Sequence, residues 1–331
     1  MKTTSMIAGF LRWPIIPRIL SLVMIVTFVF GFTIHLLEPD NFPTIFDGIW
    51  WAIVTTSTIG FGDYVPTSII GRSVAILLIL IGTGFVTTYF VTLSTAAVTN
   101  QNAFLEGKTP YQGNNHVIII GWNARVKEVI HQLKIINPLM DIILIDETLE
   151  KNPSPSNHFH FIRGNPKSDE ILTKARANEA STILITSDQS MDEDQADMCS
   201  VLTLLAVKGI NPTIYSIIEI LTFDQVKNAE RAGADEIIQT NKLSSYVMIN
   251  SLVSHGMSDA LLNMLDQLKG TKLKYLEITF DLVGMTFREC SHHLLREKKL
   301  LIGIKRGTNT MVNPDPSVII EKQDELLVIK D

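Results

Sequence analysis

Two long apolar stretches stand out in the first hundred residues, and the rest of the chain alternates between shorter apolar and polar segments. Residues 19–37 and residues 73–99 are each long enough to cross a bilayer as a helix. The second stretch is longer, so it could tilt or extend into the cytosol. No clear small-residue cleavage site follows the first stretch, which favours a retained membrane anchor over a signal peptide. The pattern predicts two membrane-spanning helices.

The charges that flank these stretches predict the orientation of the chain. Lys2, Arg12 and Arg18 precede the first stretch, and Lys108 follows the second. The connection between the stretches carries four acidic residues and a single basic one, namely Glu38, Asp40, Asp47, Asp63 and Arg72. Because lysine and arginine favour the cytoplasmic side, we expect a multi-pass protein of the plasma membrane with both termini in the cytosol.

The connection between the two stretches contains a short helical pattern followed by a glycine-rich segment. Residues 42–56 can form a helix with Trp50 and Trp51 near its middle. The segment after it reads Thr58-Ile59-Gly60-Phe61-Gly62-Asp63. An ion-selectivity filter points successive backbone carbonyls at an ion that has lost its water, and glycine permits the left-handed backbone angles that this requires at alternate positions. A glycine-rich turn between two membrane helices is the simpler alternative.

This segment resembles the potassium-channel signature, whose usual form is Thr-Val-Gly-Tyr-Gly-Asp. The resemblance implies a filter that binds K⁺ through Thr58, Ile59, Gly60, Phe61 and Gly62, supported by Trp50, Trp51 and Asp63. Phe61 keeps the aromatic packing of the family's tyrosine but lacks its hydroxyl. Val54 stands where some relatives carry a glutamate that pairs with the aspartate after the filter. We therefore expect Asp63 to bond to the indole N–H of Trp51.

The chain contains a single filter segment, and a cage of carbonyls needs four filter strands around one axis. A homotetramer in the lipid bilayer is therefore expected. Gly82 and Gly84 lie in the middle of the second stretch, where glycine weakens a helix by roughly 1 kcal/mol relative to alanine. Gly82 matches the hinge glycine of related channels by its spacing from the filter, which favours a gating hinge. Close packing between helices is the alternative.

From residue 115 onward the pattern changes to alternating strands and helices. Residues 100–114 are polar, contain two glycines and a proline, and are interpreted as a linker. Strands are predicted at residues 116–120, 141–145, 158–162, 182–186, 213–218 and 236–239, and helices at residues 124–133, 168–175, 194–207 and 222–232. This alternation predicts a parallel, doubly wound sheet of the Rossmann type.

The turn after the first of these strands is a candidate nucleotide site. Dinucleotide-binding loops use three glycines there, but this chain keeps Gly121 alone and has Asn123 and Val126 at the other two positions. Asp146 closes the second strand, where an acid that binds ribose belongs. Gly121, Asn123 and Asp146 are therefore candidates for binding NAD or an adenine nucleotide. A Rossmann fold kept for its architecture alone is the alternative.

This half of the chain resembles the RCK domain, also called KTN or TrkA-N, which regulates potassium channels and transporters. Three segments carry the resemblance: Gly121-Trp122, Arg163-Gly164-Asn165-Pro166 and Arg231-Ala232-Gly233-Ala234-Asp235. Strand-like segments at residues 274–280, 284–287, 300–305 and 325–329 resemble the small TrkA-C-like lobe that follows many RCK domains. The expected domains are a pore domain (1–99), the linker (100–114), an RCK N-lobe (115–240), a helical connector (241–270) and a small α+β C-lobe (271–331). The resemblance implies that RCK domains pair beneath the pore, with extra soluble RCK domains as an open question.

Calcium is the first gating ligand that the resemblance implies, since calcium-gated relatives with one RCK domain per subunit share this organisation. Glu219 matches one glutamate of their best-known site, and Asp188 lies close to the position of the aspartate. The acidic run from Asp188 to Asp197 could bind a cation, or it could be a solvated loop and the acidic first turn of a helix. A nucleotide is the second ligand to consider.

Composition adds three limits to this prediction. The net charge of −6 provides no basic surface for nucleic acid. The two cysteines, Cys199 and Cys290, lie far apart and fit a reducing cytosol. The mean hydropathy of +0.23 reflects the apolar stretches before residue 100. The sequence therefore predicts a ligand-gated potassium channel subunit that is not an enzyme. A non-selective cation channel and a membrane-anchored nicotinamide-dependent reductase are the alternatives.

Overall fold

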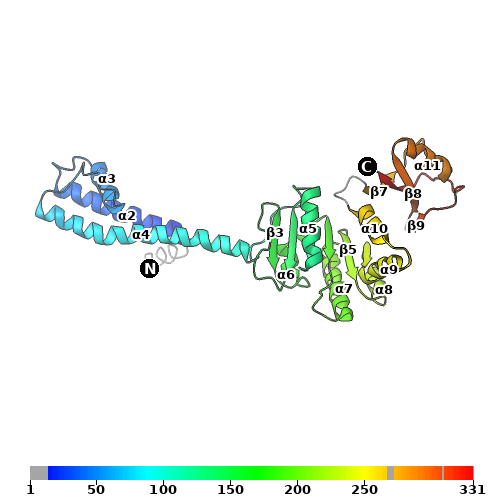
Figure 1. The fold of residues 1–331 in the computed structure, drawn as a ribbon. Coiled ribbons are helices and arrows are strands. Elements are labelled where there is room, and N and C mark those ends of the chain that lie inside the picture. Colours follow the sequence, from blue (N-terminus) through cyan, green and yellow to red (C-terminus); the bar gives the residue numbers. More distant parts are fainter. Residues whose placement is uncertain (1–13, 267–271, 308, 331) are drawn as a thin grey trace. The chain divides into compact units, whose positions relative to one another are not determined.

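The computed structural model describes residues 14–266, 272–307 and 309–330. The chain divides into two compact units, residues 1–103 and residues 104–331 (Figure 1). Lys2 and Arg12, on which the predicted orientation partly depends, lie outside the described residues.

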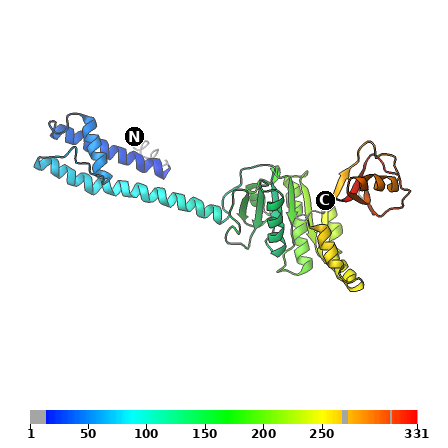
Figure 2. The same cartoon turned by 45° about the horizontal axis from the view of Figure 1, so that its top comes forward.

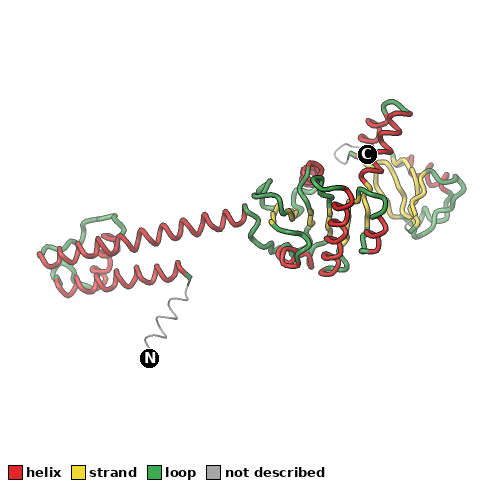
Figure 3. Tube along the Cα trace, turned by 90° about the horizontal axis from the view of Figure 1, so that it is seen from below, coloured by secondary structure: helices red, strands yellow, loops and turns green. Residues whose placement is uncertain are grey.

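The first unit contains helices and loops in its described part (Figure 3). The helices α2 (Ile15–Leu37) and α4 (Ile69–Leu105) are long and apolar enough to cross a membrane. The shorter helix α3 (Ile45–Thr56) lies in the connection between them. Glycine lets α2 and α3 touch, because a Cβ atom on Gly48 would lie 2.1 Å from the Gly31 carbonyl oxygen. The two predicted spans and the short helix between them are confirmed as elements.

The helix α4 is longer than the sequence predicted at both ends. It continues to Leu105 and therefore includes the first residues of the expected linker, 100–114. Residues 100–105 contain no glycine or proline that would end a helix. The chain turns at Gly107, whose φ of 68° is left-handed, and the Gly107 N–H donates to the Phe104 carbonyl at 3.2 Å. The extended linker is therefore shorter than predicted.

The second unit begins with a six-stranded parallel sheet in the order β3-β2-β1-β4-β5-β6. Its strands are β1 (Val117–Ile120), β2 (Ile142–Asp146), β3 (Phe159–Arg163), β4 (Thr182–Ile185), β5 (Tyr215–Ile220) and β6 (Glu236–Gln239). Its helices are α5 (Ala124–Ile136), α6 (Asp169–Lys174), the 3₁₀ turn η1 (Ala177–Glu179), α7 (Glu193–Ile210) and α8 (Val226–Arg231). The six predicted strands and the doubly wound topology are confirmed, with strand bounds shifted by two residues at most.

Two hydrophobic cores fill the two faces of this sheet. Side chains of α5, including Val126 and Ile130, pack with Ile119 and Leu144 on one face. Side chains of α6, α7 and α8 pack on the other face, together with strand residues such as Ile118. The central strands are buried on both sides, as expected for a parallel sheet with helices on both faces.

Two helices and a small second sheet complete this unit (yellow to red in Figure 2). The helices α9 (Thr240–Val253) and α10 (Met257–Leu265) occupy the predicted connector and are separated by a break at Gly256. The antiparallel sheet has the order β7-β10-β8-β9 and is packed against α11. These elements are β7 (Lys272–Glu277), α11 (Phe287–Arg296), β8 (Lys299–Arg306), β9 (Asn309–Val312) and β10 (Asp324–Lys330). The predicted α+β lobe is confirmed.

One segment of the C-lobe was interpreted wrongly from its composition. Residues 284–287 were expected to be strand-like, but Thr286 begins α11 instead. The Thr286 hydroxyl accepts the Glu289 N–H, and the Glu289 carboxylate accepts the Thr286 N–H. This capping box was present in the sequence as Thr-x-x-Glu and favours a helix start over a strand.

Candidate functional site: the glycine-rich loop and a pocket at the sheet edge

The helix α3 ends at the start of the glycine-rich segment and holds its first residues in place. A capping box between Thr44 and Asp47 fixes the start of α3. At its other end, the Val54 carbonyl accepts the N–H groups of Ile59 at 3.2 Å and Gly60 at 3.3 Å. The carbonyl end of a helix carries a partial negative charge. The C-terminal end of α3 therefore creates an electrostatic potential at the filter segment that favours a cation.

The backbone φ angles of the filter segment alternate in sign. Positive φ angles occur at Thr58 (61°), Gly60 (61°) and Gly62 (74°). The prediction that glycine supplies left-handed angles at alternate positions is consistent with this geometry. The angle at Thr58 was not foreseen, because a β-branched residue at positive φ is a steric outlier. Such strain is typical of sites where the surrounding structure imposes a functional conformation.

Trp50, rather than Trp51, supports the filter within the chain. The Trp50 indole N–H donates to the Asp63 carboxylate at 2.7 Å, and its ring stacks on Phe61 at 6.1 Å between centroids. Trp51 is buried and makes an edge contact with Phe42 instead. The expectation that Asp63 bonds to Trp51 is therefore wrong. Adjacent helical positions differ by about 100° in direction, so only one of the two indoles can face the filter.

The two glycines of α4 have different surroundings. A Cβ atom on Gly82 would lie 2.2 Å from the Cγ2 atom of Thr56, at the end of α3, whereas a Cβ atom on Gly84 would meet nothing within 4 Å. The helix continues without interruption through both positions. This geometry favours the packing alternative for Gly82, and the gating hinge stays a prediction.

Gly82→Ala is expected to destabilise the packing of α4 on α3 by about 1–3 kcal/mol, because overpacking forces neighbouring atoms apart. Thermal melting of the purified protein would measure the effect. The double variant Gly82→Ala with Thr56→Ser removes the opposing methyl group, so it should recover most of the lost stability. Gly84→Ala is the matched control and should be tolerated. Loss of gating in Gly82→Ala that Thr56→Ser does not restore would instead support the hinge.

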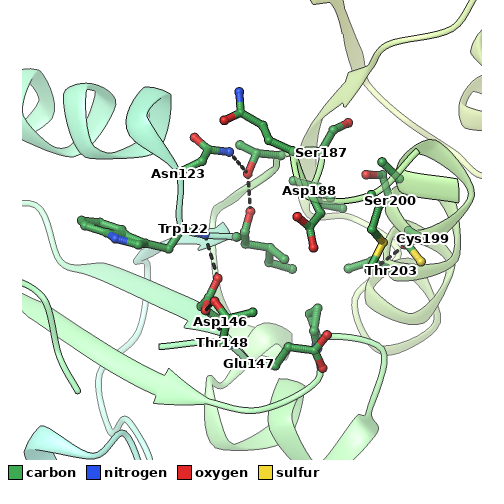
Figure 4. A pocket seen from close by; sticks show the side chains of 18 of the residues that line it. Trp122, Asn123, Asp146, Glu147, Thr148, Ser187, Asp188, Cys199, Ser200 and Thr203 are labelled. Carbon is green, nitrogen blue, oxygen red and sulfur yellow. Dashed lines mark hydrogen bonds between the residues drawn. The ribbon is translucent and has the colours of Figure 1, made fainter. Parts of the chain in front are cut away.

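A pocket of about 470 Å³ lies at the carboxyl ends of β1, β2 and β4 in the second unit (Figure 4). The strand order reverses between β1 and β4, and such a switch point is where open α/β sheets bind ligands. The pocket brings together the predicted residues Gly121, Asn123 and Asp146, and Asp188 also lines it. Four of its other lining residues come from the loop after β4 and from α7: Ser187, Cys199, Ser200 and Thr203.

Asn123 occupies the helix terminus that a dinucleotide would use for its phosphates. Its side-chain oxygen accepts the Val126 N–H at 2.9 Å and caps α5, while its amide donates to the Thr186 hydroxyl at 3.4 Å. Gly121 has a φ of 92°, and a Cβ atom there would lie 2.7 Å from that hydroxyl. The first glycine is thus required by the turn itself. The self-capped helix fits a diphosphate poorly.

Asp146 is buried at the end of β2 and holds two loops together. One carboxylate oxygen accepts the Trp122 N–H at 2.8 Å. The other accepts the N–H and hydroxyl of Thr148 and the N–H of Leu149. The oxygen that faces Trp122 keeps a lone pair, since a carboxylate offers about four acceptor sites. This arrangement fits a ribose hydroxyl, so the residues present suit the nucleoside part of a nucleotide better than its phosphates.

Asp188 and Glu219 each bond to other groups of the protein. Glu219 is 4% exposed and pairs with the Arg125 guanidinium at 2.9 Å. Glu219 also accepts the Ser187 N–H and the Thr240 hydroxyl. Asp188 accepts the N–H and hydroxyl of Ser190. Within the described residues, no group of three or more histidine, cysteine or acidic side chains could hold a metal ion. Calcium binding at these two residues stays a prediction.

Two carboxylates outside the predicted sites hold functional elements in position. Glu38 follows α2 and bonds to the start of α4. Asp197 on α7 is fully buried and accepts the N–H groups of Leu221 and Thr222 at 2.9 and 2.8 Å. Their partners lie far away in the sequence, so periodicity and motif spacing gave no signal for these contacts.

Comparison with known sequences matches both units to protein families. Residues 22–99 match the family Ion_trans_2, described as ion channel. Residues 117–240 match the family TrkA_N, described as TrkA-N domain. The two matches cover the spanning helices with the filter and the six-stranded parallel sheet, respectively.

Known relatives match over most of the chain. The chain is 40% identical over 333 residues to YugO of Bacillus subtilis (strain 168), named as a potassium channel protein, covering 99% of this chain and 100% of YugO. It is 29% identical over 265 residues to the calcium-gated potassium channel TvoK of Thermoplasma volcanium, covering 79% of this chain and 75% of TvoK. The solved GsuK channel matches with a TM-score of 0.53 at 17% identity, covering 96% of this chain and 57% of GsuK. A structure of GsuK bound to NAD has a TM-score of 0.51 at 16% identity, covering 94% of this chain and 56% of that one.

Proposed function

The chain belongs to the family of potassium channels that join a two-helix pore to an RCK domain, and from this membership we propose that four copies form a potassium-selective pore gated by a ligand of the cytosolic domain. Channels of this family are not enzymes, which removes the reductase alternative. The alternating left-handed backbone at Thr58, Gly60 and Gly62 is the observation that carries the proposed selectivity. Such alternation points successive carbonyls toward a common side, as an ion path requires.

The exposure of the filter in a single chain supports a tetramer. The side chains of Ile59 and Phe61 are 59% and 64% exposed, although apolar and aromatic residues at a packed filter should be covered. Other copies of the same segment would cover them around a fourfold axis. The lipid bilayer would cover the remaining apolar surface of α2 and α4.

RCK domains pair in the proposed assembly, and the surface of α9 and α10 supports this pairing. Neither helix contributes a buried residue within the single chain. Their large exposed side chains are mostly apolar and comprise Leu243, Tyr246, Val247, Met248, Ile249, Leu252, Val253, Leu262 and Leu265. Apolar surface of this extent marks an interaction site. A second copy of the chain is the proposed partner, and additional soluble RCK domains could complete a larger ring.

The pocket at Gly121 and Asp146 is the proposed ligand site, and a nucleotide is the ligand that its residues support best. NAD is bound in one GsuK structure, which is consistent with this assignment. Calcium is the second candidate, because the relative TvoK is named as calcium-gated. Whichever ligand binds can shift the gate only by its differential affinity for the open and closed arrangements.

The proposed topology places the plasma membrane around α2 and α4 and both termini in the cytosol. The acidic connection between these helices would then face outward, and Lys108, after α4, would lie inside. This orientation puts the pocket in the cytosol, where nucleotides are available.

Purified channel in a planar bilayer should show a reversal potential near the potassium value under a potassium/sodium gradient. A value near zero would identify a non-selective cation channel. NAD, ADP and calcium are then added in turn to the RCK side. Cys199→Phe places a ring in the pocket and should weaken the nucleotide response at least about tenfold, or 1.4 kcal/mol.

Met198→Phe adds the same ring at the neighbouring position of α7, where the native side chain is exposed, and it should respond like the native channel. A response to nucleotide that Cys199→Phe leaves unchanged would place the ligand elsewhere. A response to calcium alone would instead direct attention to Asp188 and the acidic run.

A further inference from the structure

Three histidines surround the segment that follows α4 along the chain. His160 on β3, His158 just before β3 and His116 just before β1 lie near residues 104–111. His158 and His160 line a second cavity of about 430 Å³ together with Phe104 and Tyr111. This cavity is separate from the proposed nucleotide pocket, since the two share no lining residue.

His160 makes one hydrogen bond and two ring contacts to residues of this segment. Its Nε2 atom lies 2.7 Å from the Thr109 carbonyl oxygen, and because a carbonyl can only accept, the Nε2–H donates. The Phe104 ring makes an edge contact with the imidazole at 5.2 Å between centroids. The Tyr111 ring lies at 5.7 Å from it. The imidazole therefore connects both ends of residues 104–111 to the first edge strand of the sheet.

His116 contacts the same segment through the ring of Tyr111. It is fully buried, its Nε2–H donates to the Ala175 carbonyl at 2.9 Å, and the Tyr111 ring lies 4.6 Å from its ring. Its Nδ1 atom is buried and has no hydrogen-bond partner. The imidazole is thus held as the neutral Nε2–H tautomer. A proton on Nδ1 would place a positive charge where nothing accepts it, which is costly in a buried site.

Burial is the main influence on both side chains, and it opposes protonation. Burial lowers the pKa of His116; its bond to the Ala175 carbonyl and the charges of Asp141 and Glu179 partly offset this effect, and Arg176 adds to it. Burial also lowers the pKa of His160, which its bond to the Thr109 carbonyl partly offsets.

Asp141 lines the same cavity as His160, and two other groups already bond to it. The Tyr111 hydroxyl donates to one of its oxygens at 3.0 Å, and His158 Nδ1 lies 2.8 Å from the other. From the neighbouring strand β2, the register partner of His160 is the apolar Ile143. The segment itself supplies aromatic rings and a carbonyl to the imidazole.

We propose that His160 and His116 form a proton-binding site that anchors residues 104–111 to the RCK N-lobe when neutral and releases them when protonated. This segment is the covalent link between α4 and the cytosolic domain. Acidification of the cytosol would therefore uncouple the ligand from the pore. The uncoupling rests on the gating role proposed above, whereas the anchoring itself does not.

The direction of the pH dependence follows from the lowered pKa values of His116 and His160. In the anchored arrangement the pKa of each histidine lies below 6.5. Release from the segment restores the ordinary pKa of about 6.5. The released arrangement then binds more protons over this interval. The anchored arrangement is fully stable above pH 6.5 and loses stability as the pH falls below 6.5 toward the lowered values.

Hydrogen exchange on the full-length channel tests the anchoring without reference to gating. The N–H of Tyr111 donates to the Lys174 carbonyl, and the N–H of Arg163 donates to the Gly107 carbonyl. Exchange at these amides, corrected for the intrinsic effect of pH, should accelerate between pH 7.5 and 5.5 by up to about tenfold per pH unit for each histidine. Amides of β5 serve as the internal reference. Equal protection of residues 104–111 at both pH values would overturn the proposal.

His160→Gln keeps an amide that can donate to the Thr109 carbonyl but does not titrate, so it should reduce the acceleration to the part contributed by His116. His158→Gln is the matched control, because His158 lines the same cavity but is half-exposed, and it should behave like the native chain. An acceleration that His158→Gln abolishes and His160→Gln preserves would contradict the assignment. A released segment with unchanged ligand response at pH 5.5 would retain the anchoring and refute the gating step alone.

Discussion

Replacement of Gly60 by alanine is expected to abolish selective potassium current. Gly60 has a φ of 61°, and an L-residue in the left-handed region costs roughly 1–2 kcal/mol per position, or about 4–8 kcal/mol across four subunits. If the alanine adopts a negative φ instead, the adjacent carbonyls rotate away from the ion path. Either response removes ligands that replace the water of the ion. Potassium flux into proteoliposomes that contain the variant would measure the loss.

Gly84→Ala is the matched control for this experiment, because it adds the same methyl group in the same unit. Its position is helical and meets no neighbouring atom within 4 Å, so flux and selectivity should be retained. Neither added methyl group lies near an atom of the same chain, so the fold of the subunit should be retained in both variants. A Gly60→Ala channel with native selectivity would show that the filter does not depend on the left-handed angle at this residue.

The fold could be predicted from sequence because its signals are local and repeat along the chain. Two apolar stretches predict spans by length alone, and strands alternating with helices predict a doubly wound sheet. The errors concern positions where the same local sequence pattern is compatible with two different structures. Residues 100–105, of which the first three are polar, suited either a linker or the end of a helix, and α4 continues through all of them.

The candidate sites were predictable where a motif fixes the backbone and not where distant side chains meet. The left-handed backbone angles of the filter segment followed from the positions of Gly60 and Gly62. The choice between Trp50 and Trp51 depended on the rotation of α3, which single-residue spacing does not determine. The pair of Arg125 and Glu219 joins residues 94 positions apart, so nothing near Glu219 in the sequence indicated that its charge is already balanced.

Glu38→Gln is expected to destabilise the pore unit by about 2–4 kcal/mol per subunit, because two or more buried donors would lose their acceptor. Glu38 follows α2 and is 7% exposed. Its carboxylate accepts the N–H groups of Thr67 and Ser68, each at 2.9 Å. It also accepts the Ser68 hydroxyl and the Asn41 amide. A glutamine would turn its own N–H₂ group toward these donors and would remove a negative charge from the N-terminus of α4.

The ionisation of Glu38 gives this prediction a pH signature. Burial raises the pKa of this carboxyl, but the hydrogen bonds from Ser68, Asn41 and Thr67 outweigh burial and lower the pKa to about 2. A carboxyl with a lowered pKa contributes its full stability above its ordinary value of 4.5 and loses it as the pH falls toward 2. The difference in melting temperature between the native channel and Glu38→Gln should therefore be constant from pH 5 to 8 and shrink below about 4.5.

Asp40→Asn removes the same charge from an exposed neighbour in the same loop and is the matched control. It should change the melting temperature little, because exposed charges contribute about 0–1 kcal/mol. If both substitutions lower the melting temperature equally, the hydrogen bonds to Thr67 and Ser68 contribute no stability beyond that of the negative charge. A large effect confined to Glu38 would show that the end of α2 holds the start of α4. The filter lies between these two points along the chain, so that contact would also fix both ends of the filter's supporting loop.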